Sequence, residues 1–408
     1  MKALVVGAGP AGATTALLLA RCGLDVALLE RETSFERVFR GEGLMPSGID
    51  ALIEMGLGEM LESIPGRRVE SWNIWIDGEE VFVIPEPVEE LGERATRVVS
   101  QPAFLEKVIE EASRYPSFSF ERGVRVRDLI RDAGGRVVGA ALETENGPRK
   151  AWADLLVGCD GRGSLVRTRA GLELELLPEN YDVLWFKLPA PDRLRKRCSF
   201  MITVAGQKHP AVCYTSWDGR LQYGLVMPKG GLKELRGRDW LAESVGSAPA
   251  WLAEHMFAKR SQIDGPIRLN VLVGRCRKWT APGVLLLGDA AHPMSPVRAQ
   301  GINLALRDAI VAATHLVPVL KAGAAPSVVD AACQAVQAER EPEIARAQTL
   351  QTREAAGRGD ARSVSWRFKF AKRAARLLGR YRWAQNAWLR RQHELRFGST
   401  EVKLRVSP

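Results

Sequence analysis

The sequence predicts an α/β protein that combines a βαβ unit, a mostly antiparallel sheet and a helical C-terminal segment. At the N-terminus, the apolar run 3–6, the Ala/Leu-rich stretch 10–22 and the apolar run 25–30 follow one another as strand, helix and strand. Segments within 181–227 are rich in aromatic and β-branched residues, which favour strands. From residue 330 onward the pattern is mainly helical.

Other elements follow from the same patterns. Helices are expected at 47–57, at 102–114 and from Gly301. Further strands are expected at 72–84, where two strands flank an Asp-Gly turn, and at 124–130, 136–144, 153–158 and 284–287. The strands of the antiparallel sheet are expected at 181–188, 198–204, 211–217 and 220–227, with Asp218-Gly219 as a hairpin turn.

Composition indicates a globular chain of two or three domains. The chain has 408 residues, of which 46% are hydrophobic and 26% charged. The six cysteines form no CxxC pair and stand beside no histidine cluster, so we predict no metal site and buried thiols in a reducing cytoplasm. No run of 18 or more apolar residues occurs, so no transmembrane helix is expected.

The glycine-rich turn after the first strand predicts a dinucleotide site. Residues 7–12 read GAGPAG and match GxGxxG between a strand and a helix. Gly7 permits the tight turn, Gly9 lets the backbone approach a pyrophosphate, and Gly12 lets helix and strand pack closely. Glu30 ends the second strand, where a carboxylate accepts hydrogen bonds from ribose hydroxyls. By itself this motif does not separate FAD from NAD.

Two later segments favour FAD. Residues 155–161 (LLVGCDG) place Asp160 at the carboxyl end of a buried strand, and residues 283–301 (GVLLLGDAAHPMSPVRAQG) do the same for Asp289. The Asp289 carboxylate suits ribityl or ribose hydroxyls, and the helix starting near Gly301 offers N–H groups to the flavin. A solvent-exposed turn for Asp160 and a helix-capping acid for Asp289 are the structural alternatives.

In order and spacing, these three motifs resemble the fingerprints of FAD-dependent aromatic hydroxylases, the single-component flavoprotein monooxygenases. The resemblance extends along nearly the whole chain and includes residues 40–57 and 339–351. It implies that Arg40 contacts the cofactor's phosphates or flavin and that Gln101 is a polar FAD contact. The full set of expected FAD-binding residues is Gly7, Gly9, Ala11, Gly12, Glu30, Arg31, Arg40, Gln101, Asp160, Gly288, Asp289, Pro296, Gln300 and Gly301.

The expected domains are discontinuous. Residues 1–70, 95–178 and 272–345 would form a Rossmann-like FAD-binding domain, residues 71–94 and 179–271 the substrate-binding sheet, and residues 346–408 a basic helical C-terminal segment.

The resemblance also implies a mechanism. NADH or NADPH would reduce the flavin, and oxygen would form a C4a-(hydro)peroxide that hydroxylates or epoxidises an aromatic or lipophilic small molecule. The family needs no second GxGxxG domain, and this chain has none. Aromatic candidates for the substrate pocket are Tyr181, Trp185, Tyr214, Trp217 and Tyr223, each of which has a core position as its alternative.

Catalytic residues are less well marked. Tyr214 and Tyr223 are candidates for relaying a proton, and His292 is expected to support its loop structurally. Arg298 stands where the family usually has Gly, followed by Ala299 where it often has a second Gly. Arg298 would stabilise an anionic reduced flavin, or bind an acidic substrate or the NAD(P)H phosphate, unless it is an exposed loop arginine.

Three other functions share the flavin-binding fold or the flavin. Flavin halogenases need a lysine between residues 40–57 and the next helix, and no lysine occurs from Ala3 to Glu106. Enzymes of the geranylgeranyl-reductase type reduce isoprenoid double bonds and are the main alternative. A flavin-bearing binding or sensor protein would need a buried flavin with no substrate cavity beside it.

The C-terminal segment accounts for the chain's net charge of +10, and the rest of the chain is close to neutral. From Arg362 to Arg396 there are 11 Lys/Arg and one Asp/Glu, so this segment alone has 11 − 1 = +10. An apolar stripe is expected on one helix, formed by Phe370, Ala374, Leu377, Tyr381, Ala384 and Trp388. The stripe would either dock on the FAD domain or meet an anionic membrane, making a cytoplasmic enzyme peripheral to the membrane. No recognition module accompanies the charge, so no nucleic-acid partner is expected.

Overall fold

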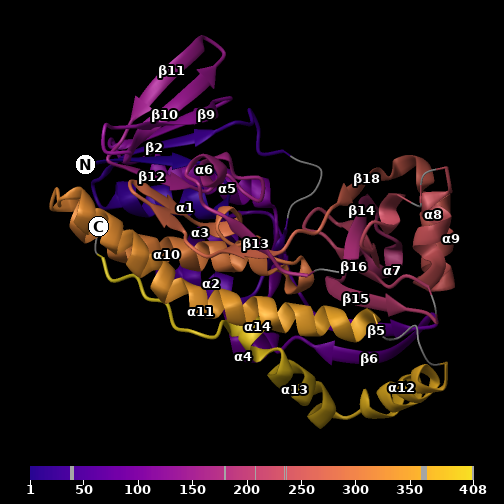
Figure 1. Cartoon of the computed structure of the whole chain (residues 1–408). Helices are drawn as coiled ribbons and strands as arrows, with labels where there is room; N and C mark the ends of the chain where they lie inside the picture. The colour runs from indigo at the N-terminus through magenta and orange to yellow at the C-terminus, as the bar shows by residue number, and fades with distance from the viewer. Residues whose placement is uncertain are drawn as a thin grey trace.

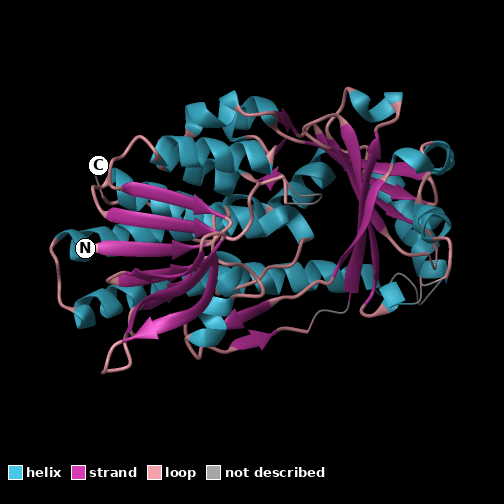
Figure 2. Cartoon of the chain, turned by 90° about the horizontal axis from the view of Figure 1, so that it is seen from above, coloured by secondary structure: helices cyan, strands magenta, loops and turns pink. Residues whose placement is uncertain are grey.

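The computed structural model describes residues 1–36, 41–178, 181–206, 208–233, 235, 237–359 and 365–406. Two large sheets lie at opposite ends of the molecule, with helices packed between and beside them (Figures 1 and 2). The long helices α10 (Gln300–Lys321) and α11 (Pro326–Gly359) run along one side. The predicted α/β class is confirmed.

A six-stranded sheet contains the predicted βαβ unit. In spatial order its strands are β20 (Thr280–Ala281), β21 (Val284–Leu286), β12 (Leu155–Gly158), β1 (Lys2–Val6), β2 (Asp25–Glu30) and β8 (Phe118–Arg122). All neighbours are parallel except β20 and β21. Because successive side chains point to opposite faces, Ala3 and Val5 join one hydrophobic core while Leu4 and Val6 join another.

A seven-stranded sheet forms the other end of the molecule. In spatial order its strands are β18 (Asp264–Leu269), β14 (Tyr181–Pro189), β17 (Arg220–Pro228), β16 (Ala211–Thr215), β15 (Ser199–Val204), β5 (Ser71–Ile76) and β6 (Glu79–Pro85). Only β15 and β5 pair in parallel, which confirms the predicted mostly antiparallel sheet. Asp77 and Gly78 both have positive φ in the predicted turn between β5 and β6.

Smaller elements complete the fold. The remaining strands are β3 (Gly43–Leu44), β4 (Gly66–Arg68), β7 (Arg97–Val99), β9 (Arg125–Arg131), β10 (Val137–Thr144), β11 (Gly147–Trp152), β13 (Leu174–Leu176) and β19 (Gly274–Cys276). The remaining helices are α1 (Pro10–Arg21), α2 (Pro46–Glu54), α3 (Gly58–Ser63), α4 (Val88–Leu91), α5 (Gln101–Ala112), α6 (Leu165–Arg169), α7 (Asp192–Arg195), α8 (Trp240–Ser244), α9 (Ala250–Ala258), α12 (Ser365–Leu378), α13 (Arg382–Arg391) and α14 (His393–Phe397). All six cysteines are free and buried, as predicted.

Helix α10 is the central core helix. By length and composition, the segment Val297–Lys321 could cross a membrane, but 78% of its apolar window is buried inside the protein. It contacts α1, α2 and α11. The predicted helix start at Gly301 is correct to within one residue.

Buried charges connect α10 to α11 and to the loop after β21. The Asp308 carboxylate accepts a hydrogen bond from the Gly288 N–H (3.1 Å) and one from Arg340 Nε (2.8 Å). His292 Nε2 lies 2.7 Å from the same carboxylate. Burial by itself would raise the pKa of Asp308, but His292 and Arg340 outweigh it and hold that pKa below its usual value. Arg340 also pairs with Glu343.

The C-terminal segment differs from the predicted single stripe. Helix α12 ends at Leu378 and α13 begins at Arg382, so the six stripe positions do not share one helix face. The break lies at Gly379, where an added Cβ would come within 2.6 Å of the Val81 carbonyl oxygen on β6. The side chain of Phe370 lies outside the described residues.

We predict that Arg340→Met strongly destabilises the protein. Removing one member of a buried ion network leaves uncompensated charge and costs about 3–5 kcal/mol. The measurement is the free energy of unfolding by urea denaturation. Arg346→Met is the matched control, because the Arg346–Glu394 pair (2.7 Å) is 44% and 40% exposed, and exposed pairs contribute about 0–1 kcal/mol. Equal effects of the two substitutions would contradict the role of the network.

Candidate functional site

A cavity of about 710 Å³ extends from the six-stranded sheet to the seven-stranded sheet. Residues that follow the carboxyl ends of four parallel strands line it: Gly7 after β1, Arg31 after β2, Asp160 after β12 and Asp289 after β21. Ligands of open α/β sheets bind at this edge. The other end of the cavity reaches β14, β15, β16 and β17.

The glycine-rich turn has the geometry of a phosphate cradle. Gly7 has φ +99°, and a Cβ there would meet the Cys159 carbonyl oxygen at 2.5 Å. A Cβ at Gly12 would meet the Gly7 carbonyl oxygen at 1.9 Å, so this glycine serves close packing. A Cβ at Gly9 would meet nothing within 4 Å, so open space lies beside the N-terminus of α1. The turn is held by Glu30, whose carboxylate accepts the Ala8 N–H at 2.9 Å.

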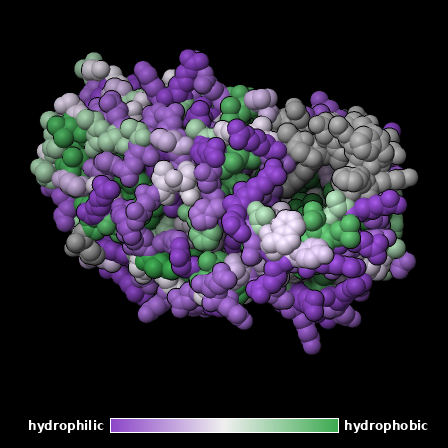
Figure 3. All heavy atoms as spheres, turned by 90° about the horizontal axis from the view of Figure 1, so that it is seen from below, coloured by the Kyte–Doolittle hydropathy of each residue, from purple (hydrophilic) through white to green (hydrophobic). Residues whose placement is uncertain are grey.

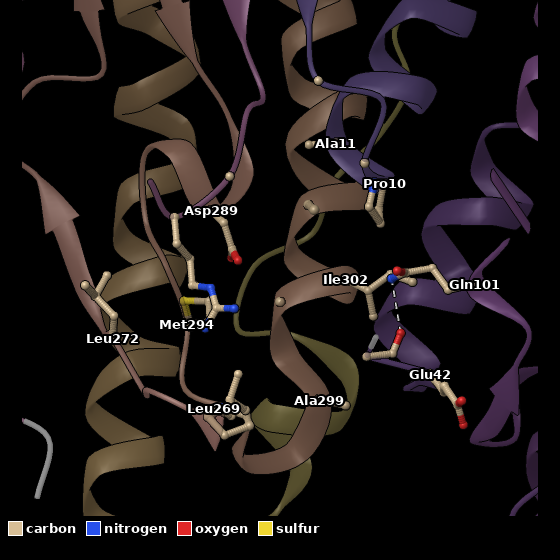
Figure 4. Close-up of a pocket in the computed structure, with 18 of the residues that line it drawn as sticks. Pro10, Ala11, Glu42, Gln101, Leu269, Leu272, Asp289, Met294, Ala299 and Ile302 are labelled. Atoms are coloured by element: carbon tan, nitrogen blue, oxygen red, sulfur yellow. Dashed lines mark hydrogen bonds between the residues drawn. The ribbon is translucent and has the colours of Figure 1, made fainter. Parts of the chain in front are cut away.

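The two aspartates have different surroundings. Asp160 accepts hydrogen bonds from Ser164 Oγ (2.5 Å) and from the Leu165 and Val166 N–H groups (2.7 and 3.1 Å). It therefore organises the start of α6 while lining the cavity. Asp289 points into the space between its own loop and α10 (Figure 4). Burial raises the pKa of Asp289, although the nearby Arg162 guanidinium lowers it.

The loop before α10 adopts a conformation that normally favours glycine. Arg298 (φ 60°) and Ala299 (φ 51°) are both left-handed. The Arg298 side chain is only 7% exposed and pairs with Glu354 at 2.7 Å, so the alternative of an exposed loop arginine is wrong. Its guanidinium lies 5.0 Å from the Trp72 ring centroid and 4.6 Å from that of Trp388. Arg298 thus joins the loop to α11 and α13, and a contact with flavin, substrate or NAD(P)H stays a prediction.

The far wall of the cavity is aromatic and apolar. Its aromatic residues are Trp72, Tyr181, Trp185, Phe200 and Tyr214, and the aliphatic ones include Val183, Ile202, Val212, Val226, Leu269 and Val271. The rings of Phe200 and Tyr214 have centroids 4.6 Å apart, and those of Trp72 and Phe200 stack at 4.8 Å. Such a wall suits a flat apolar or aromatic ligand.

A buried carboxylate, Glu42, is the main polar group at this end. It accepts hydrogen bonds from Ser216 Oγ (2.6 Å) and Gln222 Nε2 (3.0 Å), and the Tyr214 hydroxyl lies 3.5 Å away. Burial raises the pKa of Glu42, opposed by the Ser216 hydrogen bond and by Lys187. Burial and the Glu42 carboxylate together raise the pKa of Tyr214 well above its usual value.

The structure gathers most of the predicted cofactor residues around one cavity. Those that line it are Gly7, Gly9, Ala11, Glu30, Arg31, Gln101, Asp160, Asp289, Pro296 and Gly301. Gln101 Nε2 donates to the Gly41 carbonyl oxygen at 3.1 Å (Figure 4). The side chain of Gln300 is buried instead against the Arg298 and Leu395 carbonyl oxygens. Gly12 and Gly288 shape the backbone beneath the cavity, and Arg40 lies outside the described residues.

Among the predicted pocket aromatics, Tyr181, Trp185 and Tyr214 line the cavity. Tyr223 does not, because side chains alternate along β17 and its neighbour Gly224 faces the cavity instead. The Tyr223 hydroxyl donates to the Ser244 carbonyl oxygen at 2.8 Å on the other face, which makes it a core residue. Trp217 lies outside the lining, near Lys187.

Sequence reasoning missed Glu42, Trp72 and Phe200. Glu42 lies inside the segment 40–57, which resembles the aromatic hydroxylases, but the sequence does not show which residues its side chain contacts. Those partners come from β16, β17 and the hairpin between them, more than 170 residues away along the chain.

These features fit FAD. The open space at Gly9 admits a pyrophosphate, Glu30 and Asp289 offer carboxylates to hydroxyl groups, and the cavity continues to an aromatic wall. Among the described residues, no cluster of His, Cys, Asp and Glu could hold a metal ion. Gly7, Gly9, Glu30 and Asp289 would therefore hold an extended dinucleotide, which would supply the redox chemistry in this cavity.

Comparisons with known proteins agree with this fit. A family model described as an FAD binding domain matches residues 1–347. The 6-methylpretetramide 4-monooxygenase of Streptomyces rimosus is 35% identical over 358 residues, covering 85% of this chain and 82% of that protein. The probable NADH-specific resorcinol 4-hydroxylase of Rhodococcus jostii is 28% identical over 383 residues, covering 89% of this chain and 68% of that protein.

A solved structure shows the same fold. The p-nitrophenol 4-monooxygenase PnpA of Pseudomonas putida DLL-E4 has a TM-score of 0.80 and covers 98% of each chain. Its sequence identity to this chain is 19%, so the likeness concerns the fold alone.

We predict that Asp289→Ala lowers the affinity for FAD. Loss of one charged hydrogen-bond partner costs about 1–3 kcal/mol, equivalent to about a 5- to 150-fold higher dissociation constant. The measurement is titration of apoprotein with FAD, followed by quenching of flavin fluorescence. Asp128→Ala is the control, because Asp128 is an exposed residue on β9 that does not line the cavity. Unchanged affinity in Asp289→Ala would remove this carboxylate from the site.

We also predict that Glu42→Gln changes the pH dependence of stability. Because the pKa of Glu42 is raised in the folded protein, its ionisation is less favourable there than in the unfolded chain. Stability should then fall as pH rises from the usual carboxyl value of 4.5 through the folded value. Glutamine does not ionise, so the variant should gain stability relative to wild type as the pH rises above 4.5.

The measurement is urea denaturation of both proteins at several pH values. Glu59→Gln is the control, since Glu59 is exposed. A difference between variant and wild type that is constant over this pH range would contradict the assignment of a raised pKa to Glu42.

Proposed function

The chain belongs to the FAD binding domain family, and from this membership we propose that it is a monooxygenase that hydroxylates a phenolic or other electron-rich aromatic molecule. It is an FAD-dependent oxidoreductase. The proposed substrate class rests on one observation. A single cavity runs from the dinucleotide cradle at Gly7 to the aromatic wall at Trp185 and Tyr214.

The overall reaction balances with one oxygen molecule and one nicotinamide. Substrate, O2, NAD(P)H and a proton give hydroxylated substrate, water and NAD(P)+. Bound FAD supplies the two-electron transfer and the reaction with oxygen. The 6-methylpretetramide and resorcinol enzymes, named for aromatic substrates, support this class, and the name of the latter supports a nicotinamide reductant.

The chain's own residues position the substrate and exclude water. Trp185 and Tyr214 form part of the apolar wall, and Trp185 Nε1 donates to Gln222 Oε1 at 2.5 Å, which fixes its ring. Gln222 in turn donates to Glu42, so one polar network joins the wall to the segment that carries Glu42. We propose that Glu42 and Tyr214 hold the substrate's polar substituent. Glu42 lies directly before β3 and Tyr214 lies on β16, and both bring a polar group to the lining of the cavity.

We place the enzyme in the cytoplasm. The six buried free thiols suit a reducing compartment, and NAD(P)H is a cytoplasmic reductant. No nucleic-acid role is proposed. Contact with a membrane is a separate question that concerns only the C-terminal helices.

The test is incorporation of labelled oxygen. Holoenzyme with NADH or NADPH under ¹⁸O₂ is expected to add one ¹⁸O atom to a phenol from a panel that includes resorcinol and multi-ring phenols, as measured by mass spectrometry. The same mixture under ¹⁶O₂ in H₂¹⁸O is the control and should yield unlabelled product. Reduction of a geranylgeranyl double bond without oxygen would instead establish the reductase alternative. Reduced flavin that yields no product from either substrate class would favour a flavin-bearing binding or sensor protein.

A further inference from the structure

An unusual group of apolar side chains is exposed where α12 meets α13. Leu377 is 63% exposed, Leu378 40%, Tyr381 55% and Trp383 60%. Among the described side chains, ten large hydrophobic ones are exposed, and these four lie within seven consecutive residues. The rings of Tyr381 and Trp383 stack with centroids 6.4 Å apart. A soluble surface normally scatters such side chains singly, so their concentration marks a contact surface.

The packing of the turn fixes this arrangement. Gly379 sits against β6, where a Cβ would come within 2.6 Å of the Val81 carbonyl oxygen and 2.7 Å of the Phe82 ring. Lys372 and Arg376 pair with Glu79 on the same hairpin, at 3.5 and 3.6 Å. The two helices are thereby held on the β5–β6 hairpin, and the apolar side chains at the turn point to solvent.

Cations flank these apolar side chains in the sequence. Residues 372–391 contain seven Lys/Arg and no Asp or Glu. Five of the arginines form no salt bridge with another described residue, and all five are exposed: Arg373, Arg380, Arg382, Arg390 and Arg391. Figure 3 shows this side of the molecule, where hydrophobic side chains stand among hydrophilic ones. We call the four apolar residues and these five arginines the basic docking face.

The same helix pair backs the cavity. The Trp388 ring of α13 packs at 6.0 Å from that of Trp72, and Arg298 lies against both rings. Trp72 and Arg298 line the cavity, so one layer of side chains separates α13 from the cavity. A contact on the outer side of α13 is therefore close to the substrate wall.

We propose that the basic docking face binds the surface of an anionic lipid bilayer and holds the cavity wall next to it. Tryptophan and tyrosine with leucine enter the interfacial region, while arginines bind acidic headgroups. Each basic residue near such a surface strengthens binding by about fivefold. An acidic protein surface would match the arginines but would not require the protruding leucines and stacked aromatic rings. The lipid surface is a source of lipophilic aromatic substrate, but the docking itself does not rest on the proposed function.

The test is co-sedimentation of holoenzyme with vesicles. Phosphatidylcholine vesicles containing a quarter phosphatidylglycerol should pellet wild-type protein at low salt, and pure phosphatidylcholine should pellet much less. The variant Arg373→Gln/Arg380→Gln/Arg382→Gln should bind anionic vesicles about a hundredfold more weakly. The matched control is Lys150→Gln/Arg268→Gln/Lys278→Gln, which removes three exposed cations elsewhere and should bind almost as wild type does.

A second variant separates the apolar contribution. Leu377→Ser/Trp383→Ser should lose the part of the binding that survives high salt while its flavin content stays normal. Wild-type protein that ignores anionic vesicles at low salt overturns the proposal, as do equal affinities of the two triple variants. Self-association abolished by Leu377→Ser/Trp383→Ser, without vesicle binding, would assign the face to a second copy of the chain. Vesicle binding is measured without turnover, so its failure is distinguishable from failure of the oxygenation test.

Discussion

The Asp308 carboxylate is the interaction on which the site depends. It lies near the middle of α10 and accepts from the Gly288 N–H and Arg340 Nε, with His292 Nε2 at 2.7 Å, so one buried charge fixes the loop that carries Asp289 and joins it to α11. Arg340 in turn pairs with Glu343, which also receives Arg307 Nε at 3.0 Å and the Ser399 N–H at 3.1 Å. A charge network of this kind is expensive to bury unless every member is paired. This network therefore ties the loop after β21, α10, α11 and the C-terminal tail into one unit.

The segment 339–351 also supports the cavity from a distance. Its residues do not reach the cavity, yet they hold the loop around it: Gln348 Nε2 donates to the Gly274 carbonyl oxygen at 2.6 Å, and Gln351 Nε2 donates to those of Ser295 and Val297 at 2.9 and 2.6 Å. The loop needs this support because Arg298 and Ala299 occupy left-handed conformations that cost roughly 1–2 kcal/mol each for residues with a side chain. The Glu354–Arg298 pair and the two flanking tryptophans offset that cost.

The C-terminal helices belong to the site as well as to the surface. Arg396 on α14 pairs with the buried Glu86, and Glu86 also accepts the Trp72 indole N–H at 2.9 Å. Trp72 is part of the cavity wall, so α13 and α14 brace that wall from outside. The C-terminal helices therefore have an inner face that supports the cavity wall and an outer face on which four large apolar side chains are exposed.

The sequence alone determined the dinucleotide cradle, because each of its requirements is local. A tight turn at Gly7, close packing at Gly12 and a carboxylate ending the next strand all follow from residues within one βαβ unit, and Asp289 follows from the end of a single strand. The antiparallel sheet was also predictable, because alternation and turn residues are short-range signals. What lay beyond the sequence were contacts between distant segments. Glu42 contacts residues of β17 and of the hairpin before it, and Arg298 is buried against Glu354. Tyr223 faces the core, because side chains alternate along β17 and its neighbour Gly224 faces the cavity. Local patterns specify which elements form, whereas the tertiary packing decides which face of each element meets the ligand.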